Sequence, residues 1–256
     1  MIGIIGGSGL EDPKIMAGAK EVSVKTPYGK HCIIVTGKIK GIEVAVLSRH
    51  GAHHEYSPGT VPYKANVYAL HKLGCIAIIA ASACGSLKEE IVPGSLSFPA
   101  HFVDRTTKRD QSFTEHGKVI HEPMGEPFSG DLRKILEKKC KELGFDFTAE
   151  TTVVTIEGPR FSTKAESELF RSWGCDLINM TTVPEACLAK EMKIPYQVIN
   201  LVTDYDCWRE NTEHVTIEQV MKIMKENSEK VKKLISESLV EVNDKFGRAN
   251  SSLKKN

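Results

Sequence analysis

Residues 2–9, Ile2-Gly3-Ile4-Ile5-Gly6-Gly7-Ser8-Gly9, join a short apolar run to a glycine-rich one. The isoleucines predict a buried strand. Glycine lets the backbone take positive φ and approach a ligand closely. Successive N–H groups in such a loop form a concave anion site, to which Ser8 would add a hydroxyl. The stretch therefore predicts either a phosphate-binding loop or a glycine-rich corner after the first strand.

The spacing of these glycines does not fit two common nucleotide-binding loops. A P-loop would end in Gly-Lys followed by Ser or Thr, and the pattern G-x-G-x-x-G would place a third glycine where Asp12 stands. The chain also lacks a convincing acidic residue after a second strand. These glycines therefore give little support to a dinucleotide-binding oxidoreductase.

Beyond the opening loop, strand patterns alternate with helix patterns, which indicates an α/β fold with a central mixed β-sheet flanked by helices. We expect one domain over residues 1–246 and a polar C-terminal tail over residues 247–256. Residues 93–128 carry four prolines and predict an ordered excursion that reaches toward a neighbouring subunit. Apolar runs predict strands at residues 2–5, 32–39, 42–48, 75–82, 151–157, 176–180 and 196–204. Capping and periodicity predict helices that begin near residues 63, 129, 163, 183 and 216.

Small and polar residues follow six of these predicted strands. In α/β folds, ligands gather at the carboxyl ends of strands. We therefore expect six loops to meet around one site: Gly6–Gly9, Arg49–His50, Ser82–Ser86, Glu157–Ser162, Asn179–Thr182 and Thr203–Asp206.

Arg49 and His50 follow directly on an apolar strand. Arginine is the best fixed fork of donors for a phosphate, and a neighbouring imidazole would add a donor. The alternative is a surface arginine beside a structural histidine. His50, His53 and His54 lack the carboxylate–histidine helix motif of zinc sites, so we expect no metal here.

Other candidate side chains stand in the later loops. Asp204 and Asp206 would accept from an amino group or deliver a proton, or would form a turn before the last helix. Phe161 would stack on a flat ring or belong to the core. The segment Asn179–Thr182 would supply polar donors or cap the next helix.

Together, these residues offer hydrogen-bond donors for an anion, an aromatic side chain that could stack on a flat ring, polar groups that could bind a sugar, and one carboxylate. None is an evident covalent nucleophile. Such a set would hold phosphate against a nucleoside so that phosphate itself attacks the sugar. Breaking an N-glycosidic bond builds positive charge on the sugar and negative charge on the base. The phosphate anion and protonation of the base would offset these charges.

Composition narrows the partners and the compartment. The chain has 256 residues, of which 41% are hydrophobic and 26% charged, and its net charge of +1 argues against nucleic acid as a partner. Its seven cysteines form no C-x-x-C pair. We expect no signal peptide, since a basic segment followed by a long apolar one is missing, and no membrane span, since no run of 18 apolar residues occurs. A cytoplasmic protein is therefore expected.

Six ordered segments resemble the 5′-methylthioadenosine phosphorylase branch of the trimeric purine nucleoside phosphorylase family. The similarity extends from about Ile2 to Lys233, and six motifs in order are far more specific than any one. The segments are Ile4-Ile5-Gly6-Gly7-Ser8-Gly9, Ser48-Arg49-His50-Gly51, Ala83-Cys84-Gly85-Ser86-Leu87, Ile156-Glu157-Gly158-Pro159-Arg160-Phe161-Ser162, Asn179-Met180-Thr181 and Thr203-Asp204-Tyr205-Asp206.

The resemblance implies a single-domain phosphorylase fold and a homotrimer in which a neighbouring subunit completes the site. It implies no metal or organic cofactor, with inorganic phosphate as a co-substrate. The reaction would be phosphorolysis of 5′-methylthioadenosine to adenine and 5-methylthioribose 1-phosphate, in purine and methionine salvage.

The resemblance also implies roles for individual residues. Asp204 and Asp206 would be catalytic, with Asp204 assisting protonation at N7 of the purine. Phosphate would be bound by Ser8, Arg49, His50, Ser82, Ala83 and Thr181. The nucleoside would be bound by Phe161, Ser162, Met180, Ile217, Val220, Met221 and, from the adjacent subunit, His121.

Two features distinguish this chain from the 6-oxopurine branch of the family, which it also resembles. That branch has Asn where Asp204 stands, and a carboxylate acceptor suits a 6-amino group. The start of the last helix is apolar, which favours a methylthio group over a hydroxyl. The alternatives are a purine nucleoside phosphorylase of broader or 6-oxopurine (inosine or guanosine) specificity and a non-catalytic nucleoside-binding protein.

Overall fold

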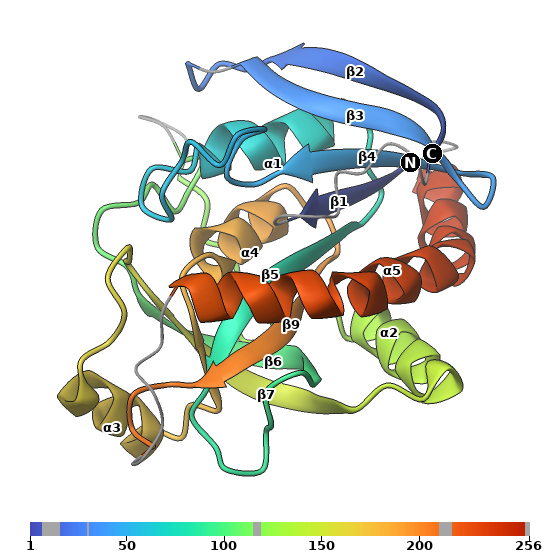
Figure 1. The fold of residues 1–256 in the computed structure, drawn as a ribbon. Helices are drawn as coiled ribbons and strands as arrows, with labels where there is room; N and C mark the ends of the chain where they lie inside the picture. Colours follow the sequence, from blue (N-terminus) through green and yellow to red (C-terminus); the bar gives the residue numbers. More distant parts are fainter. Residues whose placement is uncertain (7–15, 30, 115–118, 210–216, 254–256) are drawn as a thin grey trace.

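The computed structural model describes residues 1–6, 16–29, 31–114, 119–209 and 217–253 (Figure 1). Within them, nine strands form one sheet in the order β2-β3-β4-β1-β5-β8-β7-β6-β9, with a further pairing between β5 and β9. The strands are β1 (Ile2–Gly6), β2 (Ala17–Lys25), β3 (His31–Ile39), β4 (Ile42–Ser48), β5 (Ile78–Ser86), β6 (Leu96–Arg105), β7 (Phe147–Ile156), β8 (Leu177–Asn179) and β9 (Tyr196–Tyr205). The helices are α1 (Tyr63–Lys72), α2 (Gly130–Leu143), α3 (Lys164–Ser172), α4 (Thr182–Glu191) and α5 (Ile217–Leu253).

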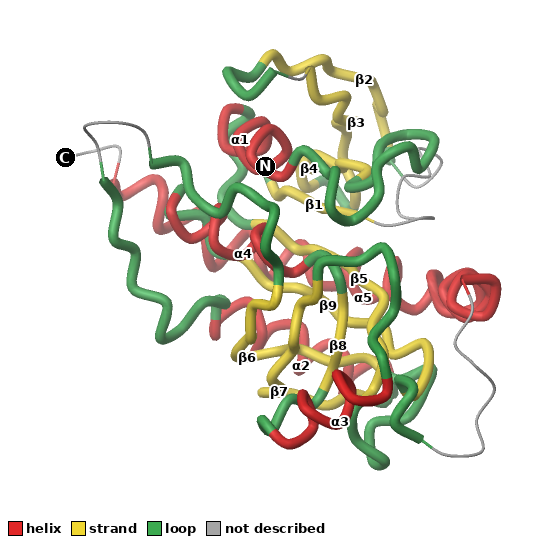
Figure 2. Tube along the Cα trace, turned by 90° about the vertical axis from the view of Figure 1, so that its left-hand side faces the viewer, coloured by secondary structure: helices red, strands yellow, loops and turns green. Residues whose placement is uncertain are grey.

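The pairing of β9 with both β5 and β6 closes β5, β8, β7, β6 and β9 into a ring. Figure 2 shows this ring below the part of the sheet that β1 to β4 form. β1, β4, β5 and β9 run parallel to one another, whereas β8 runs antiparallel to β5 and parallel to β7. The predicted mixed α/β fold is therefore confirmed.

Helices cover both faces of the sheet (Figure 1). Ile78 of β5 belongs to a core that α1 and α4 share, with Leu70 and Leu188. Its neighbour Ile79 belongs to the opposite core, which α2 and α5 share, with Leu239. Successive strand residues point to opposite faces, so a strand covered on both faces has a continuous apolar sequence.

Two strands occupy segments where none was predicted, and β5 is displaced from its predicted range. The excursion expected at residues 93–128 begins with β6, in which Pro99 lies at a register shift against β7; a bulge tolerates a proline because the ladder is already interrupted there. β2 pairs with β3 as an antiparallel edge strand. β5 runs from Ile78 to Ser86 instead of residues 75–82, because the small residues predicted to form a loop pair with β8 and β9.

The last helix also differs from its prediction. The apolar periodicity of its sequence predicts an end near Phe246, but α5 continues to Leu253. Its predicted cap, Thr216, lies outside the described residues, while the predicted capping box of α3 is present, with Thr163 and Glu166 bonded to each other's backbone. Among the described helices, none has the length and apolar character that crossing a membrane requires.

Helix α2 has conventional signals at both ends. The Ser129 hydroxyl accepts from the N–H of Leu132, and Gly144 ends the helix in the left-handed conformation with φ 68°. A side chain at such a position strains the backbone, although space around Gly144 is open. The turn after α2 therefore depends on glycine for its backbone conformation alone.

We expect Gly144→Ala to lower the free energy of unfolding by about 1 kcal/mol, because alanine resists the left-handed conformation. Gly130→Ala is the matched control, since Gly130 begins the same helix, also has open space around it and has no positive φ. Chemical denaturation of both variants measures the difference. Equal stability of the two variants would contradict this account of the turn.

Candidate active site

A cavity of about 620 Å³ is lined by residues near the carboxyl ends of β4, β5, β8 and β9. Residues from widely separated parts of the chain line it. Among the predicted site residues, the structure brings together Arg49, His50, Ser82, Ala83, Phe161, Ser162, Met180, Thr181, Asp204 and Asp206.

These residues meet although their strands do not all run the same way. β8 is short and antiparallel to β5, with Ile178 opposite Gly85. Its carboxyl end therefore runs back along β5 toward Ser82, which the Thr181 hydroxyl meets at 3.0 Å. The antiparallel β8 of this mixed sheet thus delivers its loop to the same cavity.

The anion-donor end of the cavity is built around an ion pair. The Arg49 guanidinium donates from Nε and Nη2 to the two carboxylate oxygens of Glu185, each at 2.8 Å, and from Nη1 to the carbonyl of Ala81 at 2.7 Å. The Tyr196 hydroxyl donates to the same carboxylate at 2.7 Å. Arg49 is not a surface residue, since its side chain is 2% exposed. Three of its five N–H groups are engaged, which leaves one on each Nη for an anion.

Two buried hydroxyls line the same cavity. Ser82 and Thr181 share their 3.0 Å hydrogen bond, and Ser82 also donates to the carbonyl of Ala83 at 3.1 Å. Thr181 occupies the N-cap position of α4 but makes no side-chain capping bond. Its hydroxyl is therefore directed at Ser82 in the cavity rather than at the helix, against the capping alternative.

The geometry of His50 fixes its hydrogen-bonding role. Nδ1 lies 2.8 Å from the carbonyl oxygen of Tyr56, and because a carbonyl only accepts, Nδ1 carries the hydrogen. Burial, and then the charge of Arg49, lower the pKa of His50 to about 4. At neutral pH the ring is uncharged and Nε2 is an acceptor. The expected role of His50 as a further donor to an anion stays a prediction, and it would need the protonated form of the ring.

The opposite end of the cavity holds two carboxyl groups. Burial, with a smaller contribution from Asp206, raises the pKa of Asp204 to about 6, although the Thr203 hydroxyl bonds its charged form at 2.7 Å. Asp206 accepts from the hydroxyl of Ser162 at 2.6 and 2.8 Å. An added Cβ on Gly85 would stand 2.9 Å from Asp204 Oδ1, so glycine is needed for this close approach.

Phe161 and Met180 form the apolar part of the lining. Phe161 is 40% exposed and lies at the cavity, so it is not a core residue. Gly158 has φ 64°, and an added Cβ would meet the sulfur of Met180 at 2.6 Å. The turn that carries Phe161 thus packs directly on Met180.

Some predicted site residues are not placed in this cavity. Ser8 lies outside the described residues. Ile217, Val220 and Met221 fall in the first turns of α5, where only the backbone is described. His121 is exposed and is not among the residues that line the cavity, and its neighbour Glu122 pairs with Lys193 elsewhere.

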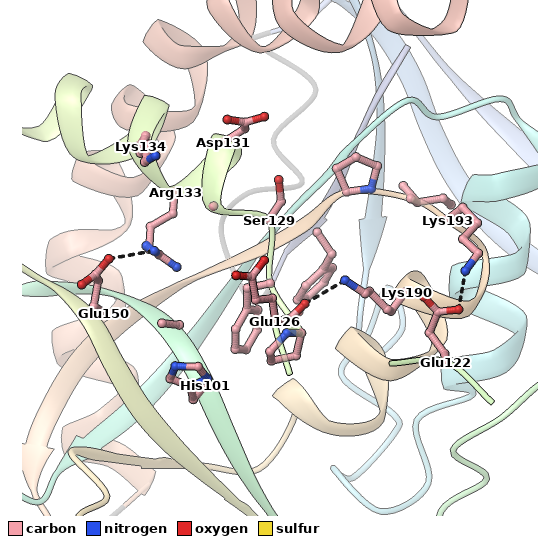
Figure 3. Close-up of a pocket in the computed structure, with 17 residues that line it drawn as sticks. His101, Glu122, Glu126, Ser129, Asp131, Arg133, Lys134, Glu150, Lys190 and Lys193 are labelled. Carbon is pink, nitrogen blue, oxygen red and sulfur yellow. Dashed lines mark hydrogen bonds and ion pairs between the residues drawn. The ribbon is translucent and has the colours of Figure 1, made fainter. Parts of the chain in front are cut away.

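A second cavity, of about 800 Å³, lies near the start of α2 and the end of α4. Figure 3 shows Arg133 paired with Glu150 at 2.9 Å, Lys193 paired with Glu122, and Lys190 bonded to the backbone carbonyl of Glu126 at 2.8 Å. None of the predicted site residues lines it. Across the described residues, no group of three or more His, Cys, Asp or Glu is arranged to hold a metal.

Sequence reasoning missed Glu185 and Arg109. Glu185 is fully buried in a helix whose neighbouring residues are mostly apolar, and this isolated acid was an available signal. Arg109 bonds the backbone of Met180, Val183 and Glu157, yet its polar segment carries no sequence signal. Both residues hold groups of the site, but neither lies in one of the loop motifs that the sequence analysis singled out.

Comparison with known proteins agrees with this fold. The sequence pattern of the phosphorylase superfamily matches residues 1–240, which defines the class of the protein. An S-methyl-5′-thioadenosine phosphorylase from Xenopus tropicalis is 48% identical over 248 residues, covering 94% of this chain and 88% of that protein. Within the superfamily, the chain belongs to the S-methyl-5′-thioadenosine phosphorylase family, as the sequence resemblance predicted.

Solved structures lead to the same family. Methylthioadenosine phosphorylase from Schistosoma mansoni in complex with adenine has a TM-score of 0.91 at 36% identity, covering 98% of this chain and 96% of that one. A variant of the adenosine/methylthioadenosine phosphorylase from the same organism, in complex with methylthioadenosine, has a TM-score of 0.87 at 35% identity, with the same coverage.

Asp204→Asn should stabilise the fold near neutral pH. The fold holds the pKa of Asp204 above its ordinary value of 3.8, so ionisation destabilises the folded state above about pH 6, and this effect disappears below about pH 4. We expect a Tm gain on the order of 5 °C at pH 7.5. The gain should vanish at pH 4.

Thermal denaturation of the wild type and the variant across this pH range measures the effect. Asp110→Asn, at an exposed carboxylate, is the control and should leave Tm unchanged at both ends of the range. A gain for Asp204→Asn that is the same at pH 4 and pH 7.5 would rule out ionisation of Asp204 as its cause.

Proposed function

We propose that this chain catalyses the phosphorolysis of 5′-methylthioadenosine, giving adenine and 5-methylthioribose 1-phosphate. One observation carries the proposal. A single cavity has anion donors around Arg49 at one end and the buried carboxyl group of Asp204, with its pKa near 6, at the other. Membership of the family supports the same reaction.

In the proposed reaction, a phosphate oxygen forms a bond to C1′ of the ribose while the bond from C1′ to N9 breaks. The electron pair of that bond moves to the purine. A proton shared between the Asp204 carboxyl group and N7 neutralises the departing base, and solvent restores it. A carboxyl group with a pKa near 6 suits this exchange near neutral pH, because both of its forms are populated.

Phosphate would occupy the end of the cavity beside Arg49, Ser82 and Thr181. Its negative charge would meet the two guanidinium N–H groups that Glu185 and the Ala81 carbonyl leave unused, and its position would stabilise positive charge on the sugar. Nε2 of His50 is an acceptor, so it would bind a protonated oxygen of the phosphate. Ala83 and Ser8 stay in the proposed phosphate site.

The purine would lie between Phe161 and the carboxyl groups. Asp204 would accept from the 6-amino group of adenine, and Ser162, held by Asp206, would contribute to reading the base edge. A 6-oxopurine would present an acceptor to the ionised Asp204, so we favour the aminopurine. The alternative function is a nucleoside phosphorylase of broader or 6-oxopurine specificity.

We also propose a homotrimer in which His121 reaches the site of an adjacent subunit, since its exposed side chain lies apart from the cavity of its own chain. Ile217, Val220 and Met221 would form the apolar wall for the methylthio group. Neither a metal nor an organic cofactor would take part. A cytoplasmic location is supported by seven free cysteines, which are typical of a reducing compartment.

A substrate panel at saturating phosphate tests the reaction. Adenine release from 5′-methylthioadenosine should require phosphate and exceed base release from inosine. Equal rates with and without phosphate would indicate a hydrolase, and a preference for inosine would support the alternative specificity.

Arg49→Lys should raise the KM for phosphate at least about tenfold and the KM for the nucleoside less, because a lysine cannot bond Glu185 and phosphate as a fork. Arg133→Lys is the matched control, since it weakens another Arg–Glu pair away from the cavity. Steady-state kinetics with each substrate varied separately measures the effect. A larger change in the nucleoside KM would contradict the place given to phosphate.

A further inference from the structure

Arg109 follows β6 in a polar segment, yet its side chain is only 1% exposed. Its guanidinium bonds groups from three parts of the chain. Nε donates to Glu157 Oε1 at 3.0 Å, Nη1 to the carbonyls of Met180 and Val183 at 2.7 Å each and to the Tyr63 hydroxyl at 3.2 Å, and Nη2 to the carbonyls of Glu157 at 2.6 Å and Ile156 at 3.4 Å.

These contacts join two walls of the cavity that leave the sheet separately. β7 and β8 pair as far as Thr155 with Asn179. Beyond that pair, β7 leads into the turn at residues 158–162, which carries Phe161 and Ser162, and β8 leads to Met180. Arg109 bonds both segments just past the last residue pair of β7 and β8. It therefore spans the point where the two segments leave the sheet.

On the β8 side, Arg109 bonds the backbone where the chain enters α4. Val183 has non-helical angles, φ −105° and ψ 132°, at the start of α4. Met180 precedes Thr181, the N-cap residue of α4, so the helix supplies no N–H group for the Met180 carbonyl. Nη1 of Arg109 donates to this carbonyl instead.

Glu157 secures the same arginine on the β7 side. Its carboxylate accepts from Arg109 and also from the N–H of Lys108 at 3.0 Å and from the N–H of Thr107. Burial would raise the pKa of Glu157, but these backbone donors and Arg109 lower it overall. The charged carboxylate thus fixes the segment that carries Arg109.

The two walls are also in direct contact, since Gly158 leaves no room for a Cβ against the sulfur of Met180. A shift of either wall therefore moves the other. Arg109 itself is not among the residues that line the cavity, so it acts through the groups it holds.

We propose that Arg109 is a positioning residue that sets the spacing between Met180 and the turn at residues 158–162, and so aligns the nucleoside over the attacking phosphate. This role rests on the proposed function, in which Met180 lies under the ribose and Phe161 against the base. Arg109 would thus help to align the nucleoside without touching the substrate.

Arg109→Lys tests the role, because a lysine has one ammonium centre and cannot bond both walls as the guanidinium does. We expect kcat/KM for 5′-methylthioadenosine to fall by about tenfold to a hundredfold, as displacement of a reacting group does. The KM for phosphate should stay within about threefold. Lys108→Met removes a neighbouring exposed charge and should behave like the wild type.

Hydrogen exchange of the native protein supplies a readout that loss of overall stability would not reproduce. In Arg109→Lys, amide exchange should rise together in residues 156–162 and 179–183, while exchange in α2 stays at the wild-type rate. Unchanged exchange in either segment, or wild-type kcat/KM in this variant, would overturn the proposal.

If Arg109→Lys does not fold, Glu157→Gln decides in its place, because it keeps the side-chain size and removes the charge that orients Arg109. The same pattern of exchange and kinetics, smaller in size, is expected, and its absence would overturn the proposal. A wild type that releases no adenine with phosphate would refute the proposed function instead, while hydrogen exchange would still test whether Arg109 joins the two walls.

Discussion

The buried ion pair of Arg49 and Glu185 is the constraint on which the site depends. Both side chains are at most 2% exposed, and a buried charge without its partner is strongly destabilising. The end of β4 and the first turns of α4 must therefore stay together, and Tyr196 of β9 is tied to the same carboxylate. β4, α4 and β9 thus meet at one fixed guanidinium. The remaining N–H groups of this guanidinium are the donors available at the end of the cavity where we propose that phosphate binds.

Burial has opposite consequences at the two ends of this cavity. It lowers the pKa of His50 and raises that of Asp204, because in each case the low-polarity surroundings disfavour the charged form. His50 becomes a neutral acceptor, and Asp204 becomes a carboxyl group that exchanges its proton near neutral pH. In the proposed reaction, the same physical cause would suit one end of the cavity to a protonated oxygen of phosphate and the other end to the departing base.

The loop motifs were predictable, but the groups that hold them were not. Arg49, Thr181 and Asp204 stand in short polar segments after apolar runs, which is a local pattern. The partner of Arg49 lies 136 positions away, and Arg109 reaches Met180 across 71 positions. β6 escaped prediction because Pro99 weakens its strand signal, although the proline lies at a register shift. Contacts of this kind follow from the path of the chain in space, which local patterns do not encode.

The sequence by itself determined the α/β class, the six loop segments and the family, because apolar periodicity, glycine placement and motif order are local properties of the chain. Only the tertiary structure decided that β8 runs antiparallel to β5 and still delivers Thr181 to Ser82. It also decided which nitrogen of His50 carries the hydrogen, and it placed β1 between β4 and β5. The physical reason is that strand direction, burial and hydrogen-bond partners depend on residues far apart in the chain.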